Sequence, residues 1–261
     1  IKALKNLKMN NVLITGSGGQ LGQCLRAIHK NYPKLKFTFL SKNELDITNE
    51  EQLRKLFLKY KFKFCVNTAA YTNVDLAESQ KKKAYLVNET GAKLISKHCK
   101  KHDVFLIHIS TDYVFDGTKG SAYYPDDAPN PINIYGMSKL AGERAIFDVC
   151  GDFTIIRTSW LYSEYGQNFQ TKILNRIKEK KKIKVVNNIF GTPTYAPILA
   201  KYILNKITSK KEWEKIEHFS QKKTMSWYDL ANKITRKTKI EPVNDTELKQ
   251  KANRPKNTSL A

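Results

Sequence analysis

The chain has 261 residues, of which 41% are hydrophobic and 27% are charged. This length can bury one substantial core, or one nucleotide-binding domain with a smaller attachment. No apolar run reaches the roughly 18 residues of a membrane span, and the lysine-rich start lacks the apolar stretch of a signal peptide. We expect residues 1–8, which precede Met9, to have no role in the fold.

The formal net charge of +22 raises the question of a nucleic-acid partner. Only seven of the 46 basic residues are Arg, and the lysines are spread along the whole chain. Arg is the better fork for bases and phosphates, and no basic motif interleaved with aromatic residues occurs. We interpret the lysines as a charged surface, which would also favour an anionic substrate, and we expect no nucleic-acid partner and no membrane partner.

The cysteines bear on the redox compartment. Cys24, Cys65, Cys99 and Cys150 lie far apart and form no CxxC pair. This spacing favours neither a zinc site nor a disulfide framework, and it is typical of a reducing cytoplasm. We expect a cytoplasmic protein in which these four side chains are buried apolar fillers.

Strand-like and helix-like segments alternate along the first 160 residues. The expected strands are the short apolar runs at 11–15, 37–40, 64–67, 104–109 and 153–157. The expected helices cover 20–31, 50–60, a lysine-rich segment that ends near His102, and 135–149, with a long loop over 116–134. Thr48 is the expected N-cap of the second helix. Apolar strands separated by helices predict a parallel sheet that is covered on both faces.

The rhythm loosens beyond about residue 160. Helices are expected over 169–182, 197–207 and 227–237, with a short strand at 184–186. We therefore predict a doubly wound, Rossmann-like α/β domain over residues 1–160. Residues 161–261 are expected to form a smaller, mainly substrate-binding α/β part, some segments of which return to the sheet.

A glycine-rich loop follows the first strand. Its sequence, Gly16-Ser17-Gly18-Gly19-Gln20-Leu21-Gly22, lies between a predicted strand and a predicted helix. Glycines let the backbone turn sharply and approach a pyrophosphate, whose charge is favoured by a helix N-terminus. The loop, opened by Gly16, therefore predicts an NAD(P) cofactor.

The end of the second strand bears on the choice of cofactor. An acid there would pair with the 2′-hydroxyl of NAD, whereas this chain has Ser41-Lys42, which could accept a 2′-phosphate. We favour NADPH over NADH, although Lys42 also fits an ordinary surface lysine. Asp46-Ile47 is placed to approach the adenine, and Ala69-Ala70-Tyr71 to line the cofactor, although small residues at 69 and 70 also fit a packed turn.

The candidate chemical site follows the fourth strand. That strand ends in Ser110-Thr111-Asp112, and Tyr135-Gly136-Met137-Ser138-Lys139 comes further along the chain. The four-residue interval puts the Tyr135 phenol and the Lys139 ammonium on one helical face. A nearby cation stabilises a phenolate, so we expect Lys139 to lower the pKa of Tyr135 and make proton exchange with a carbonyl or alcohol oxygen feasible. Thr111 can donate a hydrogen bond to the same oxygen.

A series of short motifs follows the chain in this order: GxxGQLG, LDIT, NTAAYTNVD, STDYVFDG, YGMSKLAGE, RTSWLYS, GTPT, SWYDLA and NRPKNTSL. With these motifs the sequence resembles a known family, the dTDP-4-dehydrorhamnose reductases of the extended short-chain dehydrogenase group. The resemblance covers roughly residues 11–260. It implies NAD(P)H-dependent reduction of the C4 ketone of dTDP-4-dehydro-L-rhamnose to dTDP-L-rhamnose, a step of polysaccharide biosynthesis.

The resemblance also implies roles for individual residues. Thr111, Tyr135 and Lys139 would be catalytic, and Tyr135 and Lys139 would also contact the cofactor. Thr111, Asp112 and Trp160 would face the sugar, with the indole as a flat wall, although Trp160 also fits an ordinary core position. The residues implied at the dinucleotide are Gly19, Gln20 and Leu21 near the pyrophosphate, with Asp46, Ile47, Ala69, Ala70 and Tyr71 along the rest.

The chain departs from the family pattern at several positions. Cys24 stands where Glu is common, and Asn188-Ile189 where an Asp-Gln pair is common. Some family members are thought to form a metal-assisted dimer through acidic residues, so we expect no bound Mg²⁺ here, and a homodimer stays an open alternative. Related chains usually continue past the NRPKNTSL region, whereas this sequence ends at Ala261.

Three other functions compete with this one. A sugar-nucleotide dehydratase needs an additional acid, typically Asp-Glu after the strand-four Thr, but Tyr113 follows Asp112 here. A reductase of another nucleotide-linked 4-keto-6-deoxy sugar would look much the same. A non-catalytic, NADP-binding regulatory subunit like that of methionine adenosyltransferase could retain the Tyr-Lys pair. A metal site is not expected, because the histidines show no ligand spacing apart from His98 and His102, which we interpret as surface residues of a lysine-rich helix.

Overall fold

The structure is a computed structural model that describes residues 10–209, 211–235 and 239–261. Its central sheet has six parallel strands in the order β2-β1-β3-β4-β5-β10. The strands are β1 (Asn10–Thr15), β2 (Leu35–Leu40), β3 (Phe64–Asn67), β4 (Phe105–Thr111), β5 (Phe153–Thr158) and β10 (Ile216–Phe219). The expected α/β class with a parallel sheet is confirmed. The edge strand β10 comes from beyond residue 160 and runs parallel to β5.

The strand order places a crevice at the carboxyl end of β1. This strand pairs with β2 on one side and with β3 on the other, so the winding of the chain reverses there. Open α/β sheets bind ligands at such a switch point. Because helices cover both faces, an inner strand such as β5 buries all six of its residues, which explains its continuous run of non-charged side chains up to Arg157.

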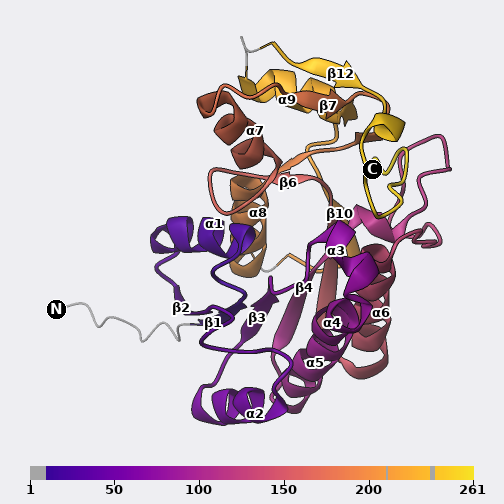
Figure 1. Cartoon of the computed structure of the whole chain (residues 1–261). Coiled ribbons are helices and arrows are strands. Elements are labelled where there is room, and N and C mark those ends of the chain that lie inside the picture. Colours follow the sequence, from indigo (N-terminus) through magenta and orange to yellow (C-terminus); the bar gives the residue numbers. More distant parts are fainter. Residues whose placement is uncertain (1–9, 210, 236–238) are drawn as a thin grey trace.

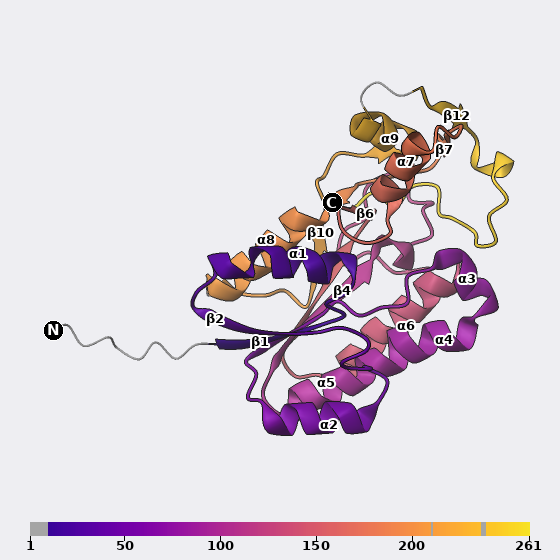
Figure 2. The same cartoon turned by 60° about the vertical axis from the view of Figure 1, so that its left-hand side comes forward.

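Helices lie against both faces of the sheet (Figure 1). Figure 2 shows α1 and α8 on one face and α2, α5 and α6 on the other. The helical segments of this part are α1 (Gln20–Ile28), η1 (His29–Asn31), α2 (Glu50–Lys59), α3 (Val74–Ser79), α4 (Lys81–Tyr85), the π-helical turn η2 (Leu86–Gly91), α5 (Ala92–Lys101), η3 (Asp112–Val114), α6 (Ile134–Val149) and α8 (Ala196–Thr208).

The two layers of core follow from the two-residue period of the strands. Along β1, Val12 and Ile14 pack against the α1 and α8 side, whereas Leu13 packs against the α2, α5 and α6 side. The expected burial of Cys24, Cys65, Cys99 and Cys150 is confirmed, and all four are free thiols within these two layers.

The start of α2 differs from the expectation. Asn49, and not Thr48, is the N-cap, because the Asn49 side chain accepts a hydrogen bond from the Gln52 N–H at 3.0 Å. Thr48 instead donates its N–H and its hydroxyl to Asp46 Oδ1, at 2.9 and 2.7 Å. The prediction of Thr48 as the cap was wrong because the helix begins one residue later, and the Asn49 side chain accepts the hydrogen bond from its first turn.

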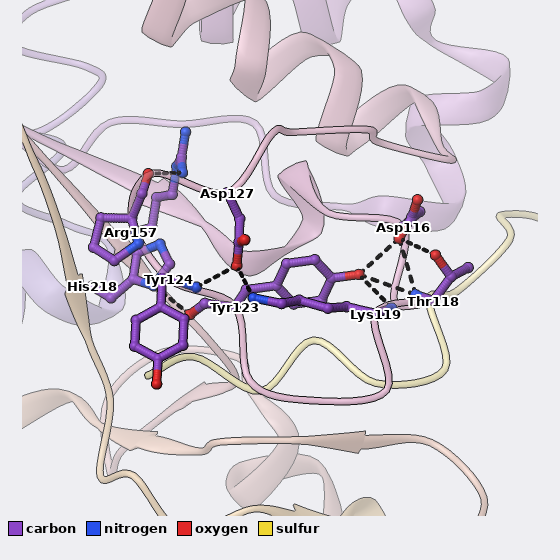
Figure 3. Close-up of polar contacts among 9 residues, drawn as sticks. Asp116, Thr118, Lys119, Tyr123, Tyr124, Asp127, Arg157 and His218 are labelled. Carbon is purple, nitrogen blue, oxygen red and sulfur yellow. Dashed lines mark hydrogen bonds and ion pairs between the residues drawn. The ribbon is translucent and has the colours of Figure 1, made fainter.

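The loop that leads from η3 to α6 is held by its own polar side chains (Figure 3). Asp116 accepts hydrogen bonds from Thr118 and from the Tyr123 hydroxyl, the latter at 2.7 Å. Asp127 accepts from the Tyr124 N–H at 2.7 Å and from Lys119. The loop is tied to the sheet because Arg157 of β5 donates to the Pro125 carbonyl at 3.2 Å. A long segment without a helix is thereby fixed ahead of α6.

A smaller layer from the C-terminal part lies beyond the carboxyl ends of the central strands (Figure 1). Its own core joins Ile173, Val185, Ala231 and Ile240. Its elements are β6 (Leu161–Tyr162), α7 (Phe169–Lys178), β7 (Lys184–Val186), β8 (Phe190–Gly191), β9 (Thr194–Tyr195), β11 (Met225–Ser226), α9 (Trp227–Thr235), β12 (Glu241–Val243) and η4 (Asp245–Glu247).

Helix α7 ends four residues earlier than expected. The chain leaves the helix through Lys180, which takes the left-handed conformation with φ +53°. The Lys181 N–H then donates to the Arg176 carbonyl at 2.9 Å, which closes the end of the helix. The expectation of a helix to Lys182 was wrong. The sequence has no glycine at this turn, so it gave no sign that the backbone takes the left-handed conformation at Lys180. The predictions for residues 1–8 and for the last two residues of the helix expected over 227–237 lie outside the described residues.

Candidate active site

The glycine loop joins β1 to α1 as the sequence predicts. Gly16 has φ +64°, and a Cβ there would lie 2.6 Å from the Ala69 Cα, so only glycine fits between the two backbones. The Gly19 N–H donates to the Gly16 carbonyl at 2.8 Å, and Gly19 begins α1 without a side-chain cap. Because no side chain caps the N-terminus of α1, its backbone N–H groups can bind an anion, as a pyrophosphate-binding loop requires.

A cavity of about 260 Å³ lies beside this loop at the outer end of the crevice. It contains most of the residues expected along the adenosine half of a dinucleotide. The residues that line it are Gly16, Gly18, Gly19, Lys42, Leu45, Asp46, Ile47, Thr68, Ala69, Ala70, Tyr71, Lys83 and Val87. Leu45, Lys83 and Val87 were missed, because the sequence shows them only as members of ordinary amphipathic segments.

Two acids that follow β2 already accept hydrogen bonds from protein groups. Glu44 accepts hydrogen bonds from the Ser41 N–H and hydroxyl, at 2.8 and 2.7 Å. These bonds, first that of the Ser41 hydroxyl, lower the pKa of the Glu44 carboxyl. The Asp46 carboxylate is held by Thr48, and the Thr48 hydroxyl is the main cause of its lowered pKa. The Lys42 ammonium is exposed at the wall of the cavity.

A second cavity, of about 500 Å³, continues from the glycine loop to the ends of β4 and β5. It brings together all the residues expected at the chemical step and at the sugar. The residues that line it are Gly18, Gly19, Gln20, Leu21, Thr68, Ala70, Thr72, Ile109, Ser110, Thr111, Asp112, Tyr135, Lys139, Thr158, Ser159, Trp160, Leu161, Gly166, Gln167, Asn168 and Phe169. Gly18, Gly19, Thr68 and Ala70 line both cavities, so the two form one cleft.

Tyr135 lies in the first turn of α6, against η3. The helix begins behind Asn133, whose side chain accepts from the Gly136 N–H at 2.8 Å. A Cβ at Gly136 would lie 2.1 Å from the Tyr113 carbonyl oxygen, so the glycine lets α6 approach η3 closely. The Tyr113 and Tyr135 rings consequently meet edge to face, with centroids 5.8 Å apart. This contact fixes the phenol at the wall of the cleft.

The pKa of Tyr135 moves in the direction opposite to the expected one. Burial raises the pKa of the phenol to about 12, although a hydrogen bond with Thr111 acts to lower it. The expected lowering by Lys139 is not met, because burial has the larger effect and Lys139 Nζ is bonded to the Ile109 carbonyl. A phenol with this pKa is protonated near neutrality, which suits a group that gives a proton away.

Lys139 is 2% exposed and is held by β4 from the opposite side. Its Nζ donates to the Ile109 carbonyl at 2.7 Å and lies 3.2 Å from the Nε2 of His108. Burial lowers the pKa of Lys139 to about 8, against the opposing effect of the Glu143 carboxylate on the same helix. His108 was not among the predicted site residues, since its place on an apolar strand gave no signal.

Asp112 is 2% exposed and accepts hydrogen bonds from two threonines. Thr111 donates to its Oδ1 at 3.0 Å, and Thr258, from the C-terminal segment, donates to its Oδ2. Burial raises the pKa of Asp112 to about 7, while these hydrogen bonds act to lower it. The carboxyl therefore joins the end of β4 to the C-terminal segment, a contact that the sequence motif containing Thr258 did not reveal.

Trp160 lines the cleft but shows little of its ring to it. The indole is 7% exposed and stacks on Trp227, with ring centroids 3.6 Å apart and planes 6° apart. A Cβ at Gly191 would lie 2.7 Å from the indole Cε2, so the backbone of β8 also covers it. Trp227 belongs to the motif SWYDLA, and its contact with a residue of the site was not predicted from the sequence.

A buried ion pair joins β5 to α6. Arg157 of β5 and Glu143 of α6 are each 2% exposed, and Arg157 Nη2 lies 2.8 Å from Glu143 Oε2. Ser110 donates a further hydrogen bond to Glu143. The pair was missed because Glu143 and Arg157 appear in the motifs YGMSKLAGE and RTSW without a sign that they meet.

The expectation that His98 and His102 are surface residues is wrong for His98. His98 is 7% exposed and packs on Phe57, with ring centroids 5.4 Å apart.

Across residues 10–209, 211–235 and 239–261, no three His, Cys, Asp or Glu side chains come close enough to hold a metal ion. Over the same ranges, no helix is long and apolar enough to cross a membrane. Ile189 is 2% exposed, and Asn188 exchanges hydrogen bonds with Asp245 at 2.8 and 3.0 Å.

A glycine loop at the switch point, together with a Tyr-x-x-x-Lys pair on α6 that faces the end of the fourth strand, defines a nicotinamide-dinucleotide oxidoreductase of the short-chain type. The model of the family described as RmlD substrate binding domain matches residues 9–261. The chain therefore belongs to the dTDP-4-dehydrorhamnose reductase family.

Relatives and solved structures agree with this assignment. The chain is 36% identical to the dTDP-4-dehydrorhamnose reductase of Aggregatibacter actinomycetemcomitans, over 85% of this chain and 77% of that protein. It is 35% identical to a dTDP-4-keto-6-deoxy-D-glucose reductase of Streptomyces niveus, over 88% and 79%. The crystal structure of the dTDP-4-dehydrorhamnose reductase from Bacillus anthracis in complex with NADP has a TM-score of 0.92 and 35% identity, over 97% of this chain and 90% of that one.

Proposed function

We propose that this protein is an NAD(P)H-dependent reductase that converts the C4 ketone of dTDP-4-dehydro-L-rhamnose to the alcohol of dTDP-L-rhamnose. The observation that carries the proposal is the single cleft. Its walls join an uncapped helix N-terminus for a pyrophosphate to a protonated phenol at Tyr135 and a hydroxyl at Thr111. A hydride donor and a ketone can therefore be held side by side.

The cleft fits a nicotinamide dinucleotide along its length. Bound NAD(P)H supplies the hydride for C4 of the sugar. Gly16, Gly19, Gln20 and Leu21 would hold the pyrophosphate, with Asp46, Ile47 and residues 69–71 along the adenosine. We favour NADPH over NADH because Lys42 is free to meet a 2′-phosphate, whereas the Glu44 carboxylate, which would suit a 2′-hydroxyl, is already bonded to Ser41.

At the end of the cleft beside β4 and α6, the side chains would transfer a proton to the sugar. When the sugar is bound, the Thr111 hydroxyl would turn from Asp112 to the C4 oxygen. Thr111 and Tyr135 would then both donate hydrogen bonds to this oxygen, which polarises the ketone. As charge develops on this oxygen, Tyr135 passes its phenolic proton to it. Lys139 would contact the cofactor ribose, and in its protonated form it would stabilise the phenolate that remains. Asp112 and Trp160 would face the sugar, and Phe169 and Gln167 line the same region. The exposed lysines favour the approach of a doubly phosphorylated substrate.

The test is to mix the purified protein with NADPH and dTDP-4-dehydro-L-rhamnose, and to follow the loss of NADPH and the sugar product. We expect stoichiometric oxidation of NADPH and formation of dTDP-L-rhamnose. The same assay with dTDP-4-keto-6-deoxy-D-glucose separates the two named activities of the relatives. If the folded protein binds NADPH but oxidises none with either sugar, the reductase proposal fails and the regulatory-subunit alternative gains support.

The site favours a reductase over a dehydratase. Elimination of water needs a second carboxyl beside Asp112, and Tyr113 occupies that position with its ring packed on Tyr135. We further propose a cytoplasmic protein, whose substrate-binding part is formed mainly by residues 161–261. We propose that no Mg²⁺ is bound, because Cys24 stands where Glu is common in the family, and Asn188-Ile189 where an Asp-Gln pair is common. Whether the protein is a homodimer is decided by light scattering.

A further inference from the structure

A buried chain of side chains runs from Lys139 away from the cleft. Lys139 Nζ lies 3.2 Å from His108 Nε2, and the other ring nitrogen, Nδ1, lies 3.0 Å from Asn67 Nδ2. The Thr15 hydroxyl donates to Asn67 Oδ1 at 2.6 Å. These four side chains are at most 2% exposed. They connect β1, β3 and β4 to α6 beneath the cofactor cleft.

The direction of the hydrogen bonds in this chain is fixed by a backbone group. The Ala69 N–H can only donate, and it lies 3.2 Å from Asn67 Oδ1. Together with the Thr15 hydroxyl, it makes Oδ1 the acceptor end of the amide, so Asn67 Nδ2 must donate to His108 Nδ1. The Nδ1 atom therefore carries no proton. In a neutral ring the proton lies on Nε2, which faces Lys139.

This arrangement places a donor opposite Lys139 Nζ. An ammonium group has three N–H donors and no acceptor, so it cannot accept the His108 Nε2–H, whereas a neutral amine can. A charged imidazole is not an alternative, because burial holds the pKa of His108 well below its usual value. The Ile109 carbonyl at 2.7 Å can accept from either form of Lys139.

We infer that His108 is a positioning residue of this site: by donating its Nε2–H to Lys139, it favours the neutral amine and keeps that side chain able to exchange a proton. The inference rests on the proposed reductase function for its role in turnover, but the contact itself does not depend on it. After Tyr135 has given its proton to the sugar, a lysine that gains and loses a proton readily can pass one back to the phenolate.

Other charges around Lys139 act in known directions. Glu143, one turn further along α6, favours the ammonium form, but its charge is shared with Arg157 of β5. Tyr135 and Asp112 line the cleft, and neither is among the hydrogen-bond partners of Lys139 Nζ, which are His108 and the Ile109 carbonyl. Burial lowers the pKa of Lys139 to about 8, and a donor that faces Nζ acts in the same direction.

The sharpest variant is Asn67→Asp. A carboxylate at this position still accepts from Thr15 and Ala69, but it also accepts from His108 Nδ1, which moves the ring proton to Nδ1. Nε2 then becomes an acceptor for the Lys139 ammonium. His108→Gln offers an amide oxygen to the same ammonium without adding a charge. His98→Gln is the matched control, because it replaces a buried histidine on α5 that does not contact the site.

The readout is a pH titration of lysine side chains by NMR with ¹³Cε labelling, in which the Lys139 resonance is identified by its loss in Lys139→Met. In the natural chain we expect its midpoint near pH 8, well below the other lysines. Asn67→Asp and His108→Gln should each raise the midpoint by about one to two pH units, and His98→Gln should leave it in place. Melting curves of each variant establish that it is folded, and His108→Gln carries the test if Asn67→Asp does not fold.

Turnover gives an independent reading. The alkaline limb of kcat/KM should follow the Lys139 midpoint, and thus move to higher pH in both variants, while KM for the sugar stays within about twofold. If Lys139 titrates with the other lysines, or if neither variant moves its midpoint, the inference is overturned. If the midpoint behaves as expected but no keto sugar is reduced, the proposed function fails and the His108–Lys139 contact stands.

Discussion

The two ends of the cleft differ in the groups that form their walls. At the adenosine end, backbone and small side chains define the shape: Gly16 against Ala69, and the uncapped start of α1 at Gly19. At the end where we propose the chemical step, the shape depends on titratable side chains, among them the half-buried Tyr135 and the buried Lys139 and Asp112. A backbone-built site is changed most by adding atoms, whereas a side-chain-built site is changed most by removing them. This difference orders the following predictions, from the largest expected effect to the smallest.

Removing the phenolic hydroxyl should have the largest effect on catalysis. In Tyr135→Phe, kcat/KM for the keto sugar should fall on the order of 10²–10⁴-fold, because the proton donor is lost. The affinity for NADPH, measured by fluorescence titration, should change little. Tyr124→Phe is the control, since Tyr124 is 57% exposed and outside the cleft. If kcat/KM falls less than tenfold in Tyr135→Phe, the phenol is not the proton donor.

Breaking the buried ion pair should have the largest effect on stability. In Arg157→Met the Glu143 carboxylate remains buried without its partner, which should lower the free energy of unfolding by about 3–5 kcal/mol. The double variant with Glu143→Leu should recover most of this loss, because no unpaired charge remains. Urea denaturation measures both. If the double variant is no more stable than Arg157→Met, the uncompensated charge is not the cause.

Adding a methyl group should damage the adenosine end. Gly16→Ala places a Cβ about where the Ala69 backbone lies, 2.6 Å away, at a φ of +64°. We expect a loss of about 1–3 kcal/mol in stability and at least tenfold in NADPH affinity. Gly120→Ala separates the two causes, because Gly120 has φ +77° but nothing within 4 Å of a Cβ. Equal losses in both variants would attribute the effect to the positive φ alone.

The smallest effect is expected from a single exposed charge. In Lys42→Ala the KM for NADPH should rise about fivefold, equivalent to roughly 1 kcal/mol, because the contact is screened by solvent. The KM for NADH should stay unchanged, since NADH lacks the 2′-phosphate. Lys36→Ala, an exposed lysine of β2 outside both cavities, controls for the general loss of positive charge. An equal change with both cofactors would end the proposed preference for NADPH.

The same contrast explains what could be predicted from the sequence. The central strands and the glycine loop were predictable because local patterns determine them: continuous apolar runs, and glycines between a strand and a helix. The pair Tyr135 and Lys139 was predictable because helical geometry relates residues four apart. These features need no knowledge of distant parts of the chain.

The remaining features depend on contacts between distant segments. Thr258 reaches Asp112 across 146 positions, and Trp227 stacks on Trp160 from another element. The contact of Lys139 with His108 depends on which side of β4 faces α6. The early end of α7 depends on a left-handed Lys180, which composition does not indicate. The direction of the Tyr135 pKa was also missed, because burial outweighs a charge that is bonded elsewhere.

The most direct test of the account is transfer of a label from one end of the cleft to the other. NADPH carrying deuterium at C4 of the nicotinamide, on the transferred face, is mixed with the protein and dTDP-4-dehydro-L-rhamnose, and the product is analysed by NMR. The account predicts dTDP-L-rhamnose with deuterium at C4 of the sugar, and none when Tyr135→Phe replaces the natural chain over the same time. Deuterium at another carbon, or bound NADPH that keeps its label in the presence of the sugar, would contradict it.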